Sequence, residues 1–511
     1  MSDIGLVRSR TLLGLTACSI TVECRTGEGL PGTTIVGLPE NAVREARDRV
    51  KSALGHCGFD YPQRKVTINL APGHISKTGT ALDLPIALSV LGATGQIKTH
   101  RLEGFEFLGE LGLFGELRTV TGALGCALAT MNAGRTLVVP RANGREVSLA
   151  PAGSINIADN LLQVTEFLNG GADQHLPLPA PAPYLVKAAP ANQFDQVIGQ
   201  HAAKRARLLA AAGGHHLLMV GPPGTGKTML ARSLSELLPD LADDQLMEVA
   251  AVYSASGRER NNYSKPPFRD PHHSASAPAL VGGGNPVLPG EVTLAHKGVL
   301  FLDELPHFKP SVLNLLREPM ETGVAVLARA NYKVSFPRRF QLIAAMNPCP
   351  VGLSCREDAC RCSHAQVRRY QGRISGPLLD RIDLHVRVPE IPKSVLTALK
   401  QDTLKQQKVG QSSVEYQANV VRARARQRTR QGCLNVDLAG PQLTDEIEAA
   451  RIPQHFLKEA VSKYQLTARS YHKIWRIART IADLAEEATI NQAHFTQALA
   501  YRALDWERGV S

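Results

Sequence analysis

A glycine-rich segment of the sequence matches the pattern of a phosphate-binding loop. It lies between a short apolar stretch, 216–220, and a helical pattern, 229–238. Glycines let successive backbone N–H groups turn inward around phosphate oxygens, and the N-terminus of the following helix adds to the attraction. A chance match in a glycine-rich loop is the alternative, but the flanking strand and helix favour a true site. The sequence therefore predicts a nucleotide site formed by Gly221, Pro222, Pro223, Gly224, Thr225, Gly226, Lys227, which reaches the β- and γ-phosphates, and Thr228, which ligates Mg²⁺.

Two acidic residues follow the next short apolar stretch. Asp303 and Glu304 come directly after 298–302, whose composition is typical of a buried strand. The carboxyl ends of parallel strands form the edge of an α/β sheet where ligands bind, so we expect both acids near the phosphate loop. Asp303 would hold Mg²⁺ and Glu304 would polarise the attacking water. A solvated acidic turn is the alternative, but together with the loop these acids predict hydrolysis of ATP with Mg²⁺.

Four further segments resemble motifs of the AAA+ family of ATPases, and the resemblance implies one functional residue in each. Ile198-Gly-Gln looks like the adenine-side motif. Asn347, which ends a third apolar strand, 340–346, resembles sensor 1, the residue that positions the lytic water. Arg381, in Gly-Pro-Leu-Leu-Asp-Arg-Ile-Asp, is similar to the arginine finger, which reaches a neighbouring subunit and so requires a ring. Arg469, in Thr-Ala-Arg-Ser-Tyr, resembles sensor 2, which contacts the γ-phosphate from the lid.

Each of the two arginine roles has a rival in the sequence. Arg373 and Arg476 lie close to the same motifs, and an ordinary surface arginine is the alternative for Arg381 and for Arg469. The resemblance favours a catalytic set made of Glu304, Asn347, Arg381 and Arg469.

Longer strings narrow the resemblance to one branch of this family. His296-Lys-Gly-Val-Leu-Phe-Leu-Asp-Glu-Leu, Arg317-Glu-Pro-Met-Glu-Thr-Gly and Met346-Asn-Pro-Cys are similar to the magnesium-chelatase-like YifB/ComM proteins, over nearly the whole chain. Segments 268–292 and 324–336 look like the helix-2 insert and the pre-sensor-1 hairpin of the clade of magnesium chelatase and MCM helicases. The resemblance implies a homohexameric ATP-driven DNA motor, a helicase or branch-migration factor for homologous recombination in natural transformation. A chelatase-type remodeller of a protein partner is the alternative.

Hairpins of this kind line a central pore and hold DNA in the MCM-like members. The resemblance makes Arg329, Lys333, Arg338 and Arg339 candidate contacts to single-stranded or branched DNA, since repeated positive charge follows a backbone without reading sequence. Exposed basic residues with no such role are the alternative. A second basic run, 420–430, aligns its arginines on one helix face and suits either DNA or a solvated lid helix.

Four of the nine cysteines crowd into 349–362. Thiolates this close in sequence, in a reducing cytoplasm, indicate a Cys₄ zinc site made of Cys349, Cys355, Cys360 and Cys362. The Cys-x-Cys spacing is tighter than the usual gap, and many relatives have Cys-Pro-Cys-Gly where this chain has Val351. Redox-sensitive free thiols are the alternative, and His364 is a weaker substitute ligand.

The N-terminal segment mixes strand and helix patterns and resembles the Lon-protease-like domain. In that resemblance Ala81 and Leu124 stand where the serine nucleophile and its lysine would be. A Ser-Lys protease needs both groups, so a scaffold or DNA-contacting role is expected instead of proteolysis. We predict an α/β protein with four parts: a Lon-like unit, 1–170; a Pro/Ala-rich linker, 171–192; an ATPase core with the cysteine-rich insertion, 193–392; and a helical lid, 393–511.

The surplus of basic residues in the composition favours a polyanionic binding partner. Its 511 residues require several domains, and 43% hydrophobic residues exclude a disordered chain. Lys and Arg outnumber Asp and Glu by 58 to 46, a net charge of +12 that favours DNA without excluding an evenly basic surface. No stretch matches a signal peptide or a membrane span, which predicts a cytoplasmic protein without membrane contact.

Overall fold

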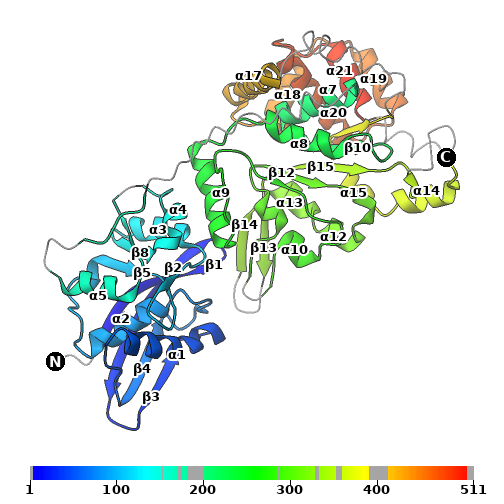
Figure 1. Ribbon diagram of the computed structural model, residues 1–511. Coiled ribbons are helices and arrows are strands. Elements are labelled where there is room, and N and C mark those ends of the chain that lie inside the picture. The colour runs from blue at the N-terminus through cyan, green and yellow to red at the C-terminus, as the bar shows by residue number, and fades with distance from the viewer. Residues whose placement is uncertain are drawn as a thin grey trace, which may run out of the picture.

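The structure is a computed structural model, and it describes residues 4–151, 153–170, 175–180, 199–284, 287–328, 333–352, 360–390 and 413–502. Of residues 322, 324–328, 333 and 334 it describes the backbone alone. Ile198, Arg329, Cys355 and most of the predicted linker lie outside the described residues. The chain forms an α/β N-terminal unit, a domain built on a parallel sheet, and a helical C-terminal part (Figure 1), which confirms the predicted α/β fold class.

The N-terminal unit is built on a four-stranded mixed sheet in the order β1-β2-β4-β3, beside a three-stranded parallel sheet, β5-β8-β9, and a hairpin, β6-β7. Alternate residues of the strands are buried because successive side chains point to opposite faces. One helix, α2, is buried along its whole length against β1. The elements are β1 (Ile4–Leu13), β2 (Thr16–Gly27), β3 (Gly32–Val36), α1 (Asn41–His56), β4 (Lys65–Ala71), α2 (Asp83–Ala93), η1 (Leu102–Gly104), β5 (Phe105–Phe107), β6 (Glu110–Leu111), β7 (Leu117–Arg118), α3 (Ala123–Asn132), β8 (Thr136–Pro140), η2 (Arg141–Asn143), α4 (Gly144–Val147), β9 (Ile155–Ala158) and α5 (Leu161–Asn169).

The central domain is a five-stranded parallel sheet in the order β11-β12-β15-β10-β16, so that each predicted apolar strand lies inside it. The predicted hairpin is also present, as the antiparallel pair β13-β14. The elements are α7 (His201–Gly213), β10 (Leu217–Val220), α8 (Lys227–Leu237), α9 (Asp243–Ala255), β11 (Phe268–Arg269), α10 (Ala277–Val281), α11 (Glu291–Leu294), β12 (Val299–Leu302), η3 (Leu305–His307), α12 (Pro310–Asn314), α13 (Arg317–Thr322), β13 (Val324–Ala328), β14 (Lys333–Pro337), β15 (Gln341–Met346), α14 (His364–Gln371), α15 (Gly376–Leu379) and β16 (Leu384–Arg387).

The two faces of the central sheet belong to different hydrophobic cores. Leu217 and Met219 of β10 pack with α7, α8 and the C-terminal helices, whereas Leu218 packs with α10, α12 and α15 on the other face. The strands are buried on both faces, as expected for a parallel sheet covered by helices on each side. Their carboxyl ends, which precede the phosphate loop, the acidic pair and Asn347, therefore meet at one edge.

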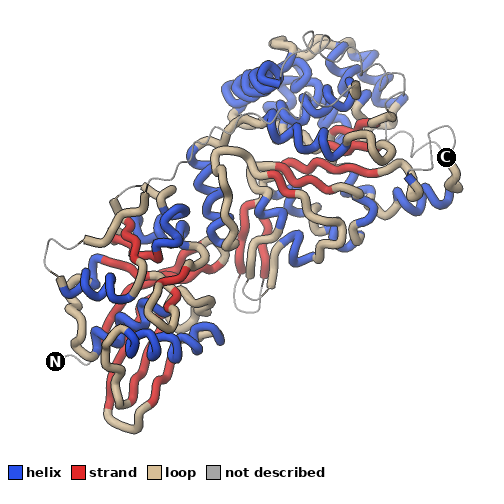
Figure 2. The backbone as a smooth tube through the Cα atoms, in the orientation of Figure 1, coloured by secondary structure: helices blue, strands red, loops and turns tan. Residues whose placement is uncertain are grey.

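The described residues from 413 to 502 are helical, in contrast to the strand-rich units before them (Figure 2). The longest buried face is that of α20, whose apolar residues recur at helical spacing and pack on α7 and α17. None of the described helices of the protein is long and apolar enough to span a bilayer. The elements are α17 (Ser413–Gln431), η5 (Asn435–Asp437), α18 (Gly440–Glu448), α19 (Gln454–Lys463), α20 (Ala468–Leu484) and α21 (Gln492–Ala500).

The N-terminal unit packs against the central domain through α3 and α9. Leu124 of α3 shares one hydrophobic core with Val252 and Tyr253 of α9, and Ala81 packs against the same core. The backbone N–H of Leu124 donates to Ser254 Oγ at 3.2 Å. The two positions where a Lon-type site would carry its serine and lysine thus border the surface that meets the ATPase core.

Candidate nucleotide-binding and hydrolysis site

The phosphate loop connects β10 to α8 at the carboxyl edge of the central sheet. Gly224 and Gly226 have φ values of +78° and +85°, in the left-handed region that favours glycine, and Gly226 immediately precedes α8. The Thr225 hydroxyl donates to Pro222 O at 2.9 Å, which holds the loop closed. Local sequence chemistry therefore produces the turn that directs backbone N–H groups toward a phosphate at the start of the helix.

Lys227 lies across its own loop. Its Nζ donates to Gly221 O at 2.7 Å and Pro222 O at 2.8 Å, and it also donates to Asn347 Oδ1 at 3.2 Å. Burial lowers the pKa of Lys227, and the carboxylates of Asp303 and Glu304 oppose that shift. The lysine and the sensor-1 asparagine, predicted from separate motifs, are thus in direct contact.

The two residues predicted to ligate Mg²⁺ are in contact with one another. Thr228 Oγ1 donates to Asp303 Oδ2 at 2.8 Å, so a hydroxyl and a carboxylate oxygen face one another beside the phosphate loop. Oxygen donors of this kind are those that Mg²⁺ prefers when a nucleotide supplies further ligands. The donor set fits ATP with Mg²⁺, which when bound would neutralise charge on the transferred phosphoryl group.

Glu304 has an unusual backbone for its position. Its φ is +51°, left-handed for a residue with a side chain, and its N–H donates to Asp303 Oδ1 at 2.9 Å. Strained conformations of this kind persist where the surrounding structure imposes them, often at active sites. The turn separates the two carboxylates, so that Asp303 faces Thr228 while Glu304 is half-exposed toward His273.

His273 is a neighbour that the sequence analysis did not identify. Its Nδ1 lies 3.5 Å from Glu304 Oε2, and its ring is 4.1 Å from that of His272 and 5.8 Å from that of His307. The His272-His273 pair was visible in the sequence, but nothing in its spacing related it to the acidic pair. The structure therefore places an imidazole beside the Glu304 carboxylate.

Arg381 and Arg469 converge on a single carboxylate, that of Glu321. Arg381 Nη2 donates to Glu321 Oε1, and Arg469 Nη2 lies 3.3 Å from the same oxygen. Arg469 Nη1 forms a second ion pair with Asp380, at 3.0 Å. The structure therefore groups the predicted arginine finger and the predicted sensor 2 in one cluster, and Glu321 is a member that the sequence analysis missed.

The rival Arg476 has a structural task instead. Its Nε donates to Leu438 O at 2.6 Å, which joins α20 to the turn after η5. Arg373, the other rival, is exposed in the turn after α14. The ion-paired cluster favours Arg381 and Arg469.

Three of the four cysteines come together. The Sγ atoms of Cys349, Cys360 and Cys362 lie within 4.8 Å of one another, and Cys349 is buried. In a tetrahedral zinc site with Zn–S bonds of about 2.3 Å, thiolates lie roughly 3.8 Å apart, so the cluster fits this metal with small adjustments. Cys355, the predicted fourth ligand, lies outside the described residues.

The prediction that Arg338 contacts DNA is wrong. Its side chain is only 2% exposed, and its guanidinium donates to Val281 O. Burial lowers its pKa to about 10, and the side chain serves to hold β14 against α10. Arg339 is exposed, whereas only the backbone of Lys333 is described and Arg329 lies outside the described residues.

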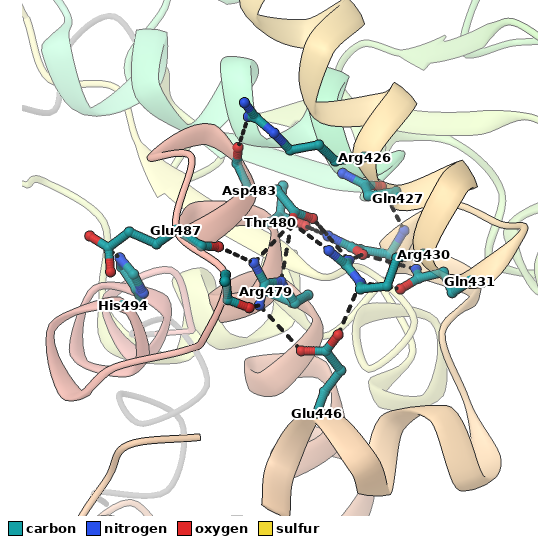
Figure 3. Close-up of polar contacts among 12 residues, drawn as sticks. Arg426, Gln427, Arg430, Gln431, Glu446, Arg479, Thr480, Asp483, Glu487 and His494 are labelled. Atoms are coloured by element: carbon teal, nitrogen blue, oxygen red, sulfur yellow. Dashed lines mark hydrogen bonds and ion pairs between the residues drawn. The ribbon is translucent and has the colours of Figure 1, made fainter. Parts of the chain in front are cut away.

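The basic run of α17 is divided between contacts within the protein and the surface, since Arg422 and Arg428 are exposed. Arg430 pairs with Asp483 at 2.7 Å and with Glu446 at 2.9 Å, and Arg426 Nη1 donates to Asp483 O at 2.8 Å (Figure 3). Arg424 Nε donates to Ala211 O at 2.8 Å, and burial lowers the pKa of Arg424 to about 10. This network ties α17 to α20 and α7, so most of these charges are occupied in holding the helices together.

Comparison with known families agrees with the three units of the structure. Residues 193–396 match the family model described as magnesium chelatase, subunit ChlI. Residues 22–143 match the model described as subunit ChlI of Mg-chelatase, and residues 410–502 match the C-terminal model of the same subunit. Together these models cover most of the chain.

Two curated relatives extend over nearly all of both chains. The chain is 44% identical to competence protein ComM of Haemophilus influenzae and 43% identical to the uncharacterized protein YifB of Escherichia coli, with 98% of each chain covered in both cases. The magnesium-chelatase 38 kDa subunit of Rhodobacter capsulatus is 28% identical over 236 residues, 42% of this chain and 60% of the subunit. The chain therefore belongs to the magnesium-chelatase-like AAA+ family that includes YifB and ComM.

Proposed function

We propose that the protein is a ring-forming ATPase that uses ATP hydrolysis to drive a DNA helicase or branch-migration activity. The observation that carries the hydrolytic part is the pair of contacts Lys227–Asn347 and Thr228–Asp303, which brings three motifs together in one site. Loop amides and Lys227 bind the phosphates, Thr228 and Asp303 hold Mg²⁺, and Glu304 with Asn347 orients the water.

The Arg381–Arg469 cluster supports assembly into a homo-oligomer. In the chain its carboxylate partners are Glu321 and Asp380, rather than groups of the phosphate loop. An arginine that stabilises the transition state from an adjacent subunit needs this kind of placement, and a hexamer supplies the same contact at every interface.

The DNA part of the proposal is supported by the similarity to competence protein ComM, by the antiparallel hairpin β13-β14 and by the net charge of +12. We propose Arg329, Lys333 and Arg339 as DNA contacts and a role in recombination during natural transformation. Six copies of these basic residues around a pore would bind the phosphate backbone without reading bases.

Strand displacement and three-strand branch migration by the purified chain test this proposal. We expect both to require ATP and to be abolished in Lys227→Ala. Lys333→Ala should weaken DNA binding and reduce the salt dependence of the affinity, whereas Lys458→Ala, on an exposed position of α19, should change neither. ATPase activity that no DNA stimulates would count against a DNA motor.

The matches to chelatase subunits favour a second candidate, a remodeller that acts on a protein partner. We propose Cys349, Cys360 and Cys362, with Cys355, as a zinc site in either case. Capture of a chelatase-like partner by a chain that lacks affinity for forks and junctions would support the remodeller.

A further inference from the structure

The cysteine cluster begins two residues after the sensor-1 asparagine. Asn347 follows β15 in the sequence. Cys349, two residues later, is buried, with only 2% of its surface exposed. Cys362 immediately precedes Ser363, which caps α14 with a capping box. The thiols therefore join the end of the strand that carries Asn347 to the start of the next helix.

The C-terminal end of α14 also contacts the residues that follow β15. Gln371 Nε2, in the last turn of α14, donates to Pro348 O at 3.0 Å, between Asn347 and Cys349. Residues 347–349 therefore lie near both ends of α14, beside the thiols that precede its start and hydrogen-bonded to its last turn.

The same loop lies directly on the phosphate loop. Gly352 has φ +60°, and a Cβ at this position would lie 3.0 Å from Pro223 Cγ and 3.4 Å from Asn347 Nδ2. A side chain at this position would press against Pro223 and Asn347, so the loop packs closely on both. Displacement of this loop would therefore reach Asn347 and the contact that it makes with Lys227.

We propose that a zinc ion bound by Cys349, Cys360 and Cys362 braces Asn347 against the phosphate loop, so that ATP hydrolysis depends on the metal. This rests on the ATPase activity proposed above and gives the cysteine site a role at the catalytic centre rather than at a DNA surface. Metal binding orders the chain between its ligands, and a shift of about 1 Å in a positioning group can cost roughly 10²-fold in rate.

Cys360→Ser and Cys362→Ser in the full-length chain test the proposal, with Cys433→Ser, in the turn after α17, as the matched control. We measure zinc per protomer, the cobalt–thiolate absorption after cobalt exchange, affinity for a fluorescent ATP analogue, and kcat. The wild type and Cys433→Ser should each hold one metal per protomer. The two test variants should lose metal and fall roughly 10²-fold in kcat, with a much smaller change in nucleotide affinity, because Lys227 and the loop amides remain.

Reversible removal of zinc from the wild-type chain tests the role of the metal without relying on variants that could misfold. The kcat should fall when zinc is chelated and recover when zinc is added back. The proposal is overturned if the wild type binds no metal, if no cobalt–thiolate band forms, or if zinc-free protein keeps its kcat. If the wild-type chain binds zinc and ATP but does not hydrolyse ATP, the proposed ATPase function is contradicted. This outcome differs from one in which ATP is hydrolysed equally well without zinc, which contradicts only the proposed role of the metal.

Discussion

Arg469 Nη1 lies 3.0 Å from Asp380 Oδ2, and this ion pair joins the lid helix α20 to the segment that carries Arg381. One turn along α20, Lys473 Nζ lies 3.0 Å from Asp383 Oδ1, so the same two segments are joined again. Two contacts spaced by a helical turn fix the orientation of α20 relative to residues 380–383. The predicted finger and the predicted sensor 2 should therefore move together when ATP is hydrolysed.

This arrangement predicts that both arginines act on a neighbouring subunit. Arg381→Ala and Arg469→Ala should each lower kcat by about 10³-fold without loss of ring assembly, because a positive charge is removed from the transition state. Mixing either variant with Lys227→Ala should restore part of the activity, since an intact phosphate loop then meets an intact arginine across an interface. ATPase assays of mixed rings, with size measured by light scattering, provide the check.

The mixing experiment also has a discriminating outcome. Arg469 acting on its own subunit's nucleotide would leave the Arg469→Ala and Lys227→Ala mixture inactive while the Arg381→Ala mixture recovers. Arg451→Ala, an exposed arginine of the same domain, is the control and should retain wild-type activity.

Substitutions of Lys227 and Glu304 should affect different steps, ATP binding for Lys227 and ATP hydrolysis for Glu304. Lys227→Ala removes the charge that reaches the phosphates, so affinity for ATP should fall strongly. Glu304→Gln keeps that charge but removes the base, so ATP should still bind while kcat drops by about 10²- to 10⁴-fold. Titration with a fluorescent ATP analogue and single-turnover hydrolysis measure the two effects, and equal loss of affinity in both variants would contradict the assignment of Glu304.

The buried Asp383–Lys473 pair should stabilise the joint between lid and core. Both side chains are less than a tenth exposed, and Asp383 also accepts from the His216 N–H at 3.0 Å. Lys473→Met leaves a buried carboxylate without its cation, which should cost about 3–5 kcal/mol. Denaturant unfolding measures the loss, with Lys458→Met as an exposed lysine control and Asp383→Asn combined with Lys473→Met expected to recover part of it.

Glu146 gives a pH dependence to the contact between the N-terminal unit and the central domain. Burial raises the pKa of Glu146 to about 7, against opposing hydrogen bonds from Asn143 and from Ser254 of α9. An unfolded glutamate has a pKa near 4.5, so the folded chain binds the extra proton between these values. The stability contributed by the protonated form is present at low pH and is lost as pH rises from about 4.5 to 7.

Glu146→Gln should therefore raise the unfolding temperature relative to wild type at pH 8 and leave it nearly unchanged at pH 4.5. The shift corresponds to about 3 kcal/mol at most, and partial exposure of the side chain reduces it. Thermal unfolding of both chains across this pH range measures the difference. A variant that is less stable than wild type at pH 8 would show that the ionised carboxylate is favourable there.

Local sequence was sufficient to predict which residues of the candidate nucleotide site lie together. The glycine loop, the acidic pair after an apolar strand and Asn347 after the next could be assigned because strand ends of a parallel sheet share one edge. The predicted helix 229–238 and the predicted hairpin 324–336 also occur within a few residues of their expected bounds, as α8 and as β13-β14, since apolar periodicity directly reflects burial on one face.

The sequence could not assign the partners of charged residues that lie outside the nucleotide motifs. Arg338 and Arg430 lie in stretches that suggest exposed basic residues, yet Arg338 donates to Val281 O and Arg430 pairs with Asp483 and Glu446. The spacing of residues along the chain does not show which group pairs with a charged side chain. The carboxylate that neutralises an arginine can come from any distant segment.

The sequence by itself was sufficient to predict the phosphate loop, the candidate magnesium ligands and the family, because each rests on short motifs whose residues are neighbours along the chain. Only the tertiary structure decided that Arg381 shares Glu321 with Arg469, that His273 faces Glu304, and that the cysteine loop rests on Pro223. These contacts join segments far apart in sequence, and they follow from how the sheet, the lid and α14 pack.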